Sequence, residues 1–203
     1  MSLEDGAFAG LWPWEPITPS DVADVLRGLP TPWWIAGGWA IELFVGHPTR
    51  RHYDLDVAIL RRDQLALRRH LAGWDLHFAT PERHLGPWDG RFLDPPIGRI
   101  WLRRARGAPW WCDAYLEEAR GDRWLYRADE RVSLPLQRVG RTSDAGLPFL
   151  SPEIVLFYML TRPTPKAKAD FLAANPRLSE PSRTWLRQAL ETAHPGHPVL
   201  PLL

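Results

Sequence analysis

The stretch from residue 33 to residue 60 constrains the fold more than any other part of the chain. It reads WWIAGGWAIELFVGHPTRRHYDLDVAIL. A short apolar run ends at Gly37 and Gly38, and apolar residues then recur at helical spacing until the next glycine. The last eight residues alternate in a way that indicates a strand with Asp54 and Asp56 on one face. The pattern therefore predicts a strand, a glycine turn, a helix and a second strand.

The remainder of the front part is expected to mix helices and strands. TPSDVADVLRGL predicts a helix with Thr18 as its N-cap and Pro19 in its first turn. RIWLRR, WWCDAYLEE and RWLYRAD predict three more strands, and the middle one carries Asp113. Residues 81–97 are rich in Pro and Gly and predict a loop with little regular structure.

From Ser151 onward the pattern becomes helical, in SPEIVLFYML, KAKADFLAAN and SRTWLRQALETAH. We therefore expect an α/β (α+β) fold, with a mixed sheet flanked by helices and a C-terminal helical segment. The expected domains are a catalytic domain over 1–145 and a helical region over 146–203 that lines the acceptor cleft.

The composition of the chain limits the cellular locations and the classes of binding partner that we expect for the protein. The chain has 25 basic and 24 acidic residues, so it lacks the strong positive charge expected of a general nucleic-acid binder. Its one cysteine, Cys112, cannot form an internal disulfide, and the start MSLEDGAFAG lacks the features of a signal peptide. No uncharged apolar stretch approaches the roughly 20 residues that span a bilayer. We expect a cytoplasmic protein with no membrane and no extended nucleic-acid partner.

The acidic residues are candidates for a metal site. Two carboxylates at i and i+2 on a strand lie about 6–7 Å apart, and hard cations such as Mg²⁺ prefer oxygen ligands. Asp113 is the candidate third acid beside Asp54 and Asp56. The residues alone leave open a solvated acidic pair at a sheet edge. They also leave open whether Gly37 and Gly38 admit a phosphate or form a plain turn.

Taken in order, the glycine pair with Trp39 and a helix, then Thr-Arg-Arg-His, then Asp-x-Asp resemble a known signature. It is that of the DNA polymerase beta-type nucleotidyltransferase superfamily. Within it the segment is similar to the small antibiotic nucleotidyltransferases that act on aminoglycosides and lincosamides. The resemblance covers about residues 31–60, while Asp113 and the helical end fit the family layout more loosely.

The resemblance implies transfer of a nucleoside monophosphate, expected to be AMP, from a nucleoside triphosphate to a hydroxyl of a small polar acceptor such as an aminoglycoside-like antibiotic. Pyrophosphate is released. Asp54 and Asp56 would bind two Mg²⁺ ions, with Asp113 as a third metal ligand or as the general base. Gly37 and Gly38 would contact the triphosphate.

The same resemblance assigns expected roles to three basic residues. Arg50 would neutralise phosphate charge during transfer, and His52 would contact phosphate or form a hydrogen bond where the strand begins. Lys166 would reach a phosphate or simply belong to a solvated helix start. Glu42 stands where family members usually carry Asp, so an arginine-pairing or helix-capping role is open for it.

Two alternatives to this function remain at the level of sequence. One is a non-catalytic regulatory module that binds nucleotide, and the other is a transferase that acts on RNA or on a protein hydroxyl. Balanced charge counts against long nucleic acid. A homodimer is open in each case.

Overall fold

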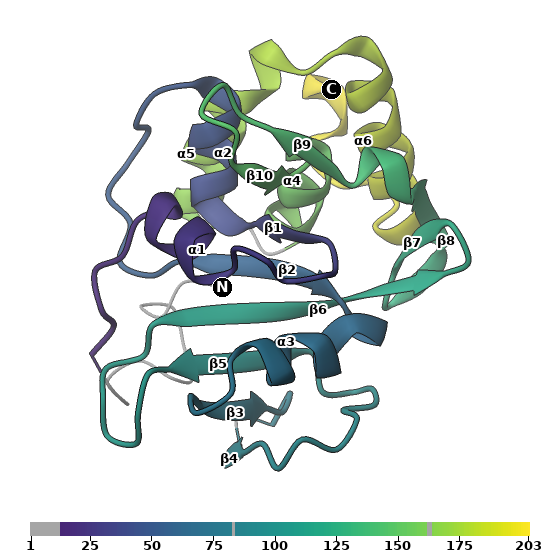
Figure 1. Ribbon diagram of the computed structural model, residues 1–203. Coiled ribbons are helices and arrows are strands. Elements are labelled where there is room, and N and C mark those ends of the chain that lie inside the picture. Colours follow the sequence, from purple (N-terminus) through teal and green to yellow (C-terminus); the bar gives the residue numbers. More distant parts are fainter. Residues whose placement is uncertain (1–12, 83, 162–163) are drawn as a thin grey trace. The chain divides into compact units, whose positions relative to one another are not determined.

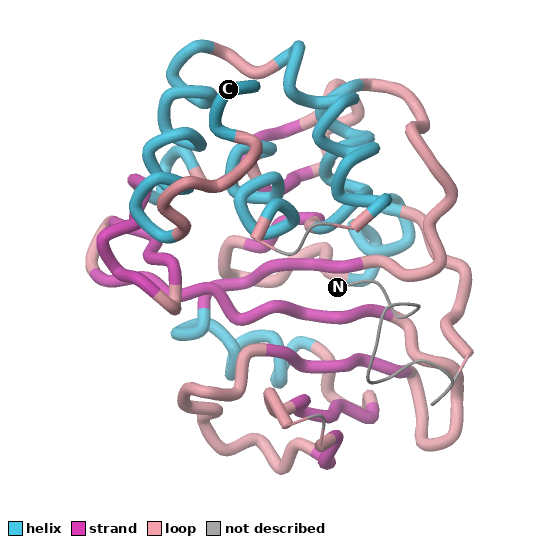
Figure 2. The backbone as a smooth tube through the Cα atoms, turned by 180° about the vertical axis from the view of Figure 1, so that it is seen from behind, coloured by secondary structure: helices cyan, strands magenta, loops and turns pink. Residues whose placement is uncertain are grey.

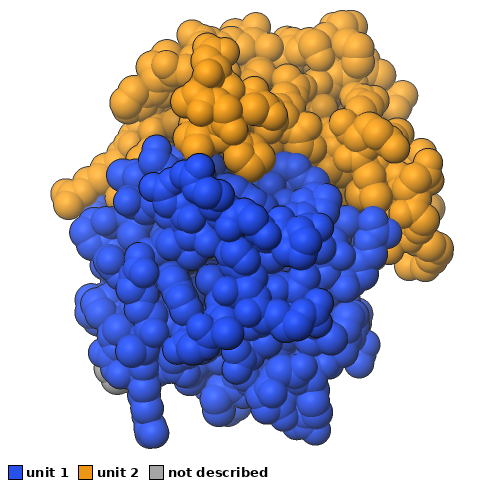
Figure 3. All heavy atoms as spheres, viewed as in Figure 1, with its two compact units in different colours: residues 1–35, 53–118 blue, residues 36–52, 119–203 orange. Residues whose placement is uncertain are grey.

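The computed structural model describes residues 13–82, 84–161 and 164–203, and within them it contains six α-helices and ten β-strands (Figure 1). The opening MSLEDGAFAG lies outside the described residues. The chain forms two compact units, coloured blue and orange in Figure 3. Unit 1 comprises residues 1–35 and 53–118, and unit 2 comprises residues 36–52 and 119–203.

Unit 1 is built on a mixed sheet. The sheet order is β4-β3-β5-β6-β2-β1, in which β2 and β6 are parallel and the other neighbours are antiparallel. The last two residues of β6 fall in unit 2. The elements are α1 (Pro19–Val25), β1 (Trp33–Ile35), β2 (Asp56–Leu60), the 3-10 helix η2 (Arg61–Asp63), α3 (Gln64–His70), β3 (Asp75–Ala79), β4 (Leu85–Pro87), β5 (Arg99–Arg103) and β6 (Cys112–Arg120).

The core of unit 1 follows the central strands. In β2, Val57, Ala58 and Ile59 have no exposed surface, so both faces of this strand are buried. Cys112 and Ala114 in the neighbouring β6 are equally buried, and the thiol is therefore part of the core. A strand buried on both faces at the centre of a sheet can hold a carboxylate at its end rigidly, because its backbone is paired on both sides.

Unit 2 is mostly helical, with two short antiparallel hairpins formed by β7–β8 and β9–β10. Helix α2 packs against α4 and α5, and α4 also packs against α6 (cyan in Figure 2). The elements are α2 (Gly37–Val45), β7 (Arg123–Tyr126), β8 (Asp129–Pro135), η3 (Leu136–Arg138), β9 (Gly140–Thr142), β10 (Pro148–Leu150), α4 (Pro152–Leu160), α5 (Pro165–Ala174), η4 (Asn175–Arg177), α6 (Glu180–Ala193) and η5 (Leu200–Leu202).

Most predicted elements are confirmed, including the mixed sheet, the helix after Thr18 and the three C-terminal helices. Thr18 forms a reciprocal capping box with Asp21 at the start of α1. Strands β3, β4, β8, β9 and β10 were not predicted, and β4 lies within the segment expected to be a loop. Three of these five strands have only three residues, too few to show an alternating pattern.

Two other predictions concern properties beyond the fold. No helix in the described part of the chain is both long and apolar enough to cross a membrane. The division into a catalytic domain over 1–145 and an acceptor-lining region over 146–203 is a functional one, and it stays a prediction.

Candidate functional site

The predicted acidic residues all belong to unit 1. Asp56 is the first residue of β2, and it stands directly opposite Asp113 of β6 in the parallel register (the two strands are neighbours in Figure 1). Asp54 departs from the prediction, because it lies in a bend two residues before β2 rather than on the strand. The register of β2 with β6 begins at Asp56, and that with β1 begins one residue later. The ladder that would hold Asp54 on the strand face is therefore missing.

Asp113 has a half-buried cationic partner on the next strand. Its side chain is 1% exposed, and one guanidinium N–H of Arg99 in β5 donates to its Oδ2. The same guanidinium lies 4.9 Å from the centre of the Tyr115 ring, which fixes it from a second side. Oδ1 of Asp113 is buried and accepts no hydrogen bond from any described residue. A buried carboxylate oxygen without a partner is a vacant acceptor that suits a cation or a proton donor.

The pKa values of Asp56 and Asp113 are both raised in unit 1. Burial raises the pKa of Asp56 to about 8, and the negative charges of Asp54 and Asp113 add to the increase. Burial also raises the pKa of Asp113, although the Arg99 guanidinium opposes that shift. Carboxylates that resist ionisation because they are buried and repel one another gain most from a nearby cation.

The donor set suits the predicted Mg²⁺ in its chemistry, because it consists of carboxylate oxygens and includes the vacant Oδ1 of Asp113. As the side chains stand, however, no group of three or more His, Cys, Asp or Glu within the described residues is close enough to hold a metal ion. Arg99 is the cation that Asp113 contacts in this arrangement. Metal binding by Asp54, Asp56 and Asp113 stays a prediction.

The predicted glycines belong to unit 2 and form the first turn of α2, whereas the sequence pattern placed them before the helix. Gly37 has a φ of 60°, a left-handed backbone conformation that residues other than glycine adopt only with strain. At Gly38 a Cβ atom would lie 2.5 Å from Cε1 of His52 and 2.8 Å from Cζ of Arg50. Carbon atoms pack at about 3.5–4.0 Å, so this position accepts only glycine while those two side chains keep their places.

Glu42 organises the loop that carries Arg50 and His52. Its Oε1 accepts hydrogen bonds from the backbone N–H groups of Thr49 at 2.7 Å and Arg50 at 3.1 Å. Nε2 of His52 lies 2.9 Å from the same oxygen, and the His52 ring stacks on Trp39 with 4.6 Å between ring centres. The arginine-pairing role left open for Glu42 is thus replaced by a role in holding the loop backbone and the histidine.

These contacts set the protonation of the loop. Burial lowers the pKa of His52 despite the opposing hydrogen bond to Glu42, so the neutral imidazole is favoured at neutral pH. The pKa of Glu42 is lowered, because hydrogen bonds from Thr49, His52 and Arg50 outweigh the effect of burial. Glu42 is therefore ionised and acts as an acceptor for the whole loop.

Arg50 makes a two-point contact with α5. Its Nε and Nη2 each donate to the Asp170 carboxylate at 3.0 Å, and Asp170 has no exposed surface. Lys166 lies in the first turn of α5, four residues before Asp170, and is half-buried. Residues four apart share one face of a helix, so Lys166 and Asp170 point in similar directions.

Two residues with clear contacts were not assigned a role from the sequence. Arg99 gives no sequence signal, because its pairing with Asp113 depends on β5 being the neighbour of β6. Asp170 offered one signal, its spacing of four residues from Lys166.

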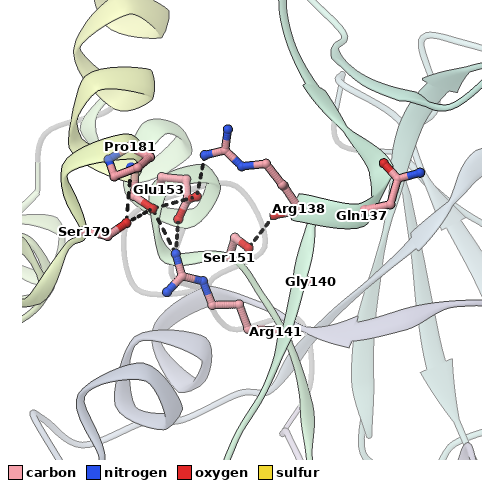
Figure 4. Close-up of a pocket in the computed structure, with 9 residues that line it drawn as sticks. Gln137, Arg138, Gly140, Arg141, Ser151, Glu153, Ser179 and Pro181 are labelled. Carbon is pink, nitrogen blue, oxygen red and sulfur yellow. Dashed lines mark hydrogen bonds and ion pairs between the residues drawn. The ribbon is translucent and has the colours of Figure 1, made fainter.

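Unit 2 also contains a polar cavity of about 290 Å³ that includes none of the predicted site residues (Figure 4). Glu153 of α4 is 1% exposed there and is contacted by Arg141 at 3.0 Å and by the hydroxyl of Ser182 at 3.0 Å. Arg138 lies at 3.8 Å from the same carboxylate. The contacts join β9, α4 and α6, and they compensate the buried charge of Glu153.

Comparison with known proteins finds one matching family model and several solved structures of similar fold. The family model described as aminoglycoside-2''-adenylyltransferase matches residues 20–83. None of the curated proteins matches the chain.

Similar solved structures cover most of the chain. The crystal structure of ANT(2'')-Ia in complex with adenylyl-2''-tobramycin has a TM-score of 0.54 and 15% identity, over 85% of this chain and 95% of that one. The lincomycin-bound lincosamide antibiotic adenylyltransferase LnuA has a TM-score of 0.52 and 15% identity, over 77% of this chain and 93% of that one. At this identity the likeness shows a shared fold, while the family match concerns the sequence segment that carries the motif. The family match confirms the predicted resemblance over residues 20–83, and the similar solved structures confirm the predicted fold class.

Proposed function

We propose that this protein transfers a nucleoside monophosphate, AMP in the first instance, from a Mg²⁺–nucleoside triphosphate to a hydroxyl group of a small polar acceptor. Pyrophosphate is the second product. An aminoglycoside-like antibiotic is the proposed acceptor class, which is supported by the family match over residues 20–83. One structure of similar fold contains an adenylylated aminoglycoside, and another contains a lincosamide.

The observation that carries the proposal is the pairing of Asp56 with Asp113 across two parallel strands. The pair combines a raised pKa at both acids with a buried, vacant oxygen on Asp113. A carboxylate with a raised pKa binds a proton more readily than an ordinary carboxylate, which suits a general base that deprotonates the acceptor hydroxyl. We assign that role to Asp113, with metal coordination as its alternative.

Asp54 and Asp56 would hold the magnesium ions, and Asp113 would be a third ligand in the alternative where it is not the base. Bound Mg²⁺ would supply charge neutralisation of the phosphates and a fixed position for the reacting oxygens. Asp54 precedes β2 and lies in a bend, outside the ladder that pairs this strand with its neighbours. Arg99 keeps the Asp113 carboxylate in one orientation while it pairs with Oδ2.

Residues of unit 2 are assigned to the triphosphate. The first turn of α2 at Gly37 and Gly38 offers backbone N–H groups, as helix starts do for phosphates. Arg50 and Lys166 would supply positive charge. His52 is favoured as a neutral ring, because burial lowers its pKa, and it is stacked on Trp39 and lies 2.9 Å from Glu42.

The experiment is a measurement of pyrophosphate release with Mg²⁺ and each of the four ribonucleoside triphosphates, across aminoglycosides, lincosamides and other hydroxyl-bearing antibiotics. We expect release that requires an acceptor and that Asp56→Asn abolishes. Asp24→Asn is a matched control, because Asp24 of α1 is exposed and pairs with the exposed side chain of Arg27, which follows that helix. The product should carry the mass of one added nucleoside monophosphate.

Other outcomes separate the alternatives. Binding of Mg²⁺–nucleotide without release would redirect the acceptor search to RNA 3′ ends and protein hydroxyls. Binding without transfer to any of these would favour the regulatory module. Failure to bind any nucleoside triphosphate would refute the transferase proposal.

A further inference from the structure

A buried carboxylate of α5 holds the guanidinium of Arg50. Asp170 has no exposed surface, and the side chain of Arg50 is 20% exposed. The two are 120 positions apart in the chain, and Nε and Nη2 of Arg50 both donate to the carboxylate. A two-point arginine–carboxylate contact fixes the plane of the guanidinium as well as its position.

The contact is expected to persist in solution. If Arg50 moved away, Asp170 would be left as a buried carboxylate without its cation, which is strongly unfavourable. The loop side of the pair is fixed too, because Glu42 binds the backbone N–H of Arg50 at 3.1 Å. Arg50 is thus held at its backbone by one carboxylate and at its side-chain end by another.

The guanidinium retains hydrogen-bonding capacity in this position. An arginine side chain carries five N–H donors. In the described part of the chain, the contacts of Arg50 use one donor on Nε, one on Nη2 and one on Nη1, the last toward the carbonyl oxygen of Arg51 at 3.3 Å. Two N–H groups remain, one on each terminal nitrogen.

The guanidinium of Arg50 lies against the first turn of α2. The position that a Cβ of Gly38 would take is 2.8 Å from Cζ of Arg50, so the guanidinium lies against the glycine backbone. A helix start already favours anions through its N–H groups and its dipole. Asp170 therefore keeps a cation with two unused donors beside an anion-favouring helix end.

We infer that Asp170 is a positioning residue for nucleotide binding: it holds the guanidinium of Arg50 at the start of α2, ready to bind a phosphate group of the nucleoside triphosphate. This inference rests on the proposed function. It gives the buried acid of α5 a role that acts through Arg50. On this inference, nucleotide affinity depends on the orientation of the Arg50 guanidinium and not on its charge alone.

The test is a double-mutant cycle with Asp170→Asn, Arg50→Lys and the double variant. Affinity for each Mg²⁺–nucleoside triphosphate is measured by calorimetry in the absence of acceptor. We expect Asp170→Asn to weaken binding about tenfold or more, which corresponds to one hydrogen bond to a charged group. In the Arg50→Lys background, where no two-point contact can form, the same change should weaken binding less than twofold.

A control and a second readout separate positioning from general damage. Asp129→Asn removes an acid of unit 2 that pairs with the exposed side chain of Arg131, and it should leave nucleotide affinity unchanged. In the transfer assay, Asp170→Asn should raise the KM for nucleotide and leave the KM for the acceptor unaltered. If Asp170→Asn does not fold, Asp170→Glu keeps the negative charge but shifts the guanidinium, and it should also weaken binding.

The possible failures are distinguishable. Wild-type protein that binds no nucleoside triphosphate would overturn the proposed function, and this inference with it. Wild-type binding that Asp170→Asn or Asp170→Glu leaves unchanged would overturn the inference alone. Tighter binding by Asp170→Asn would also overturn it, because Asp170 would then compete with phosphate for Arg50.

Discussion

Replacement of Gly38 by alanine tests how firmly the Arg50 side chain is anchored. The new methyl carbon would lie 2.5 Å from Cε1 of His52 and 2.8 Å from Cζ of Arg50, well inside normal packing distance. The end of an arginine side chain usually moves aside at little cost. Here it cannot do so without losing both hydrogen bonds to Asp170, which is fully buried.

The expected change in the free energy of unfolding combines the loss of the Arg50–Asp170 contact with the gain from alanine in a helix. A buried carboxylate that loses its partner costs about 3–5 kcal/mol. Alanine in a helix is more favourable than glycine by roughly 0.5–1 kcal/mol, which offsets part of this loss. We therefore expect Gly38→Ala to lower the free energy of unfolding by about 2–4 kcal/mol, relative to the wild type.

Urea denaturation in the absence of nucleotide provides the assay, and the Arg50→Ala background provides the control. There Asp170 has already lost its partner, so Gly38→Ala should cost at least about 1 kcal/mol less than in the wild type. His52 remains in place in both backgrounds and accounts for any residual cost. A wild-type effect below about 0.5 kcal/mol, or an equal cost in both backgrounds, would refute the anchoring argument.

Two further predictions concern charges elsewhere in the molecule. The pKa of Asp56 rises from 3.8 to about 8 on folding, so the folded state binds its proton more tightly than the unfolded state. Without divalent cations, the free energy of unfolding should therefore fall as pH rises between these values, and Asp56→Asn should reduce that slope in urea titrations. Arg141→Gln removes the 3.0 Å partner of buried Glu153 and should destabilise the fold by about 3 kcal/mol in the same assay. Arg138→Gln, at 3.8 Å and with a side chain 43% exposed, should cost under about 1 kcal/mol.

The sequence was sufficient for the elements whose signals are local. The order of strand, helix and strand over residues 33–60 was predicted because each element has its own periodicity, although the two glycines belong to the helix rather than to a turn before it. The cap at Thr18 was likewise predicted from four neighbouring residues. Asp54 was placed wrongly on the strand, because alternation in the sequence continues beyond the point where β2 has partners to pair with.

The contacts that define the candidate site depend on strand order and on long-range packing. That β2 and β6 are parallel neighbours, which sets Asp56 opposite Asp113, cannot be deduced from either strand alone. Arg99 meets Asp113 only because β5 is the next strand in the sheet. The pairing of Arg50 with Asp170 joins residues 120 positions apart, and no local pattern encodes it.

Gly38 shows why a motif residue needs its structural surroundings before it is given a role. The family resemblance implies that this glycine contacts the triphosphate, whereas the residues alone left a plain turn open. In the structure the space above it is taken by Arg50 and His52, so a side chain there would displace the protein's own groups.

Loss of nucleotide binding in Gly38→Ala is therefore expected on either account, and activity alone cannot separate them. Stability measured without nucleotide does separate them, because a glycine needed only for phosphate approach would leave the unfolding free energy nearly unchanged. A large loss that depends on Arg50 would instead show that the glycine serves the anchored arginine. In that case we expect the Arg50 guanidinium, held by Asp170, to be the main phosphate-binding group and the backbone of Gly38 to contribute less.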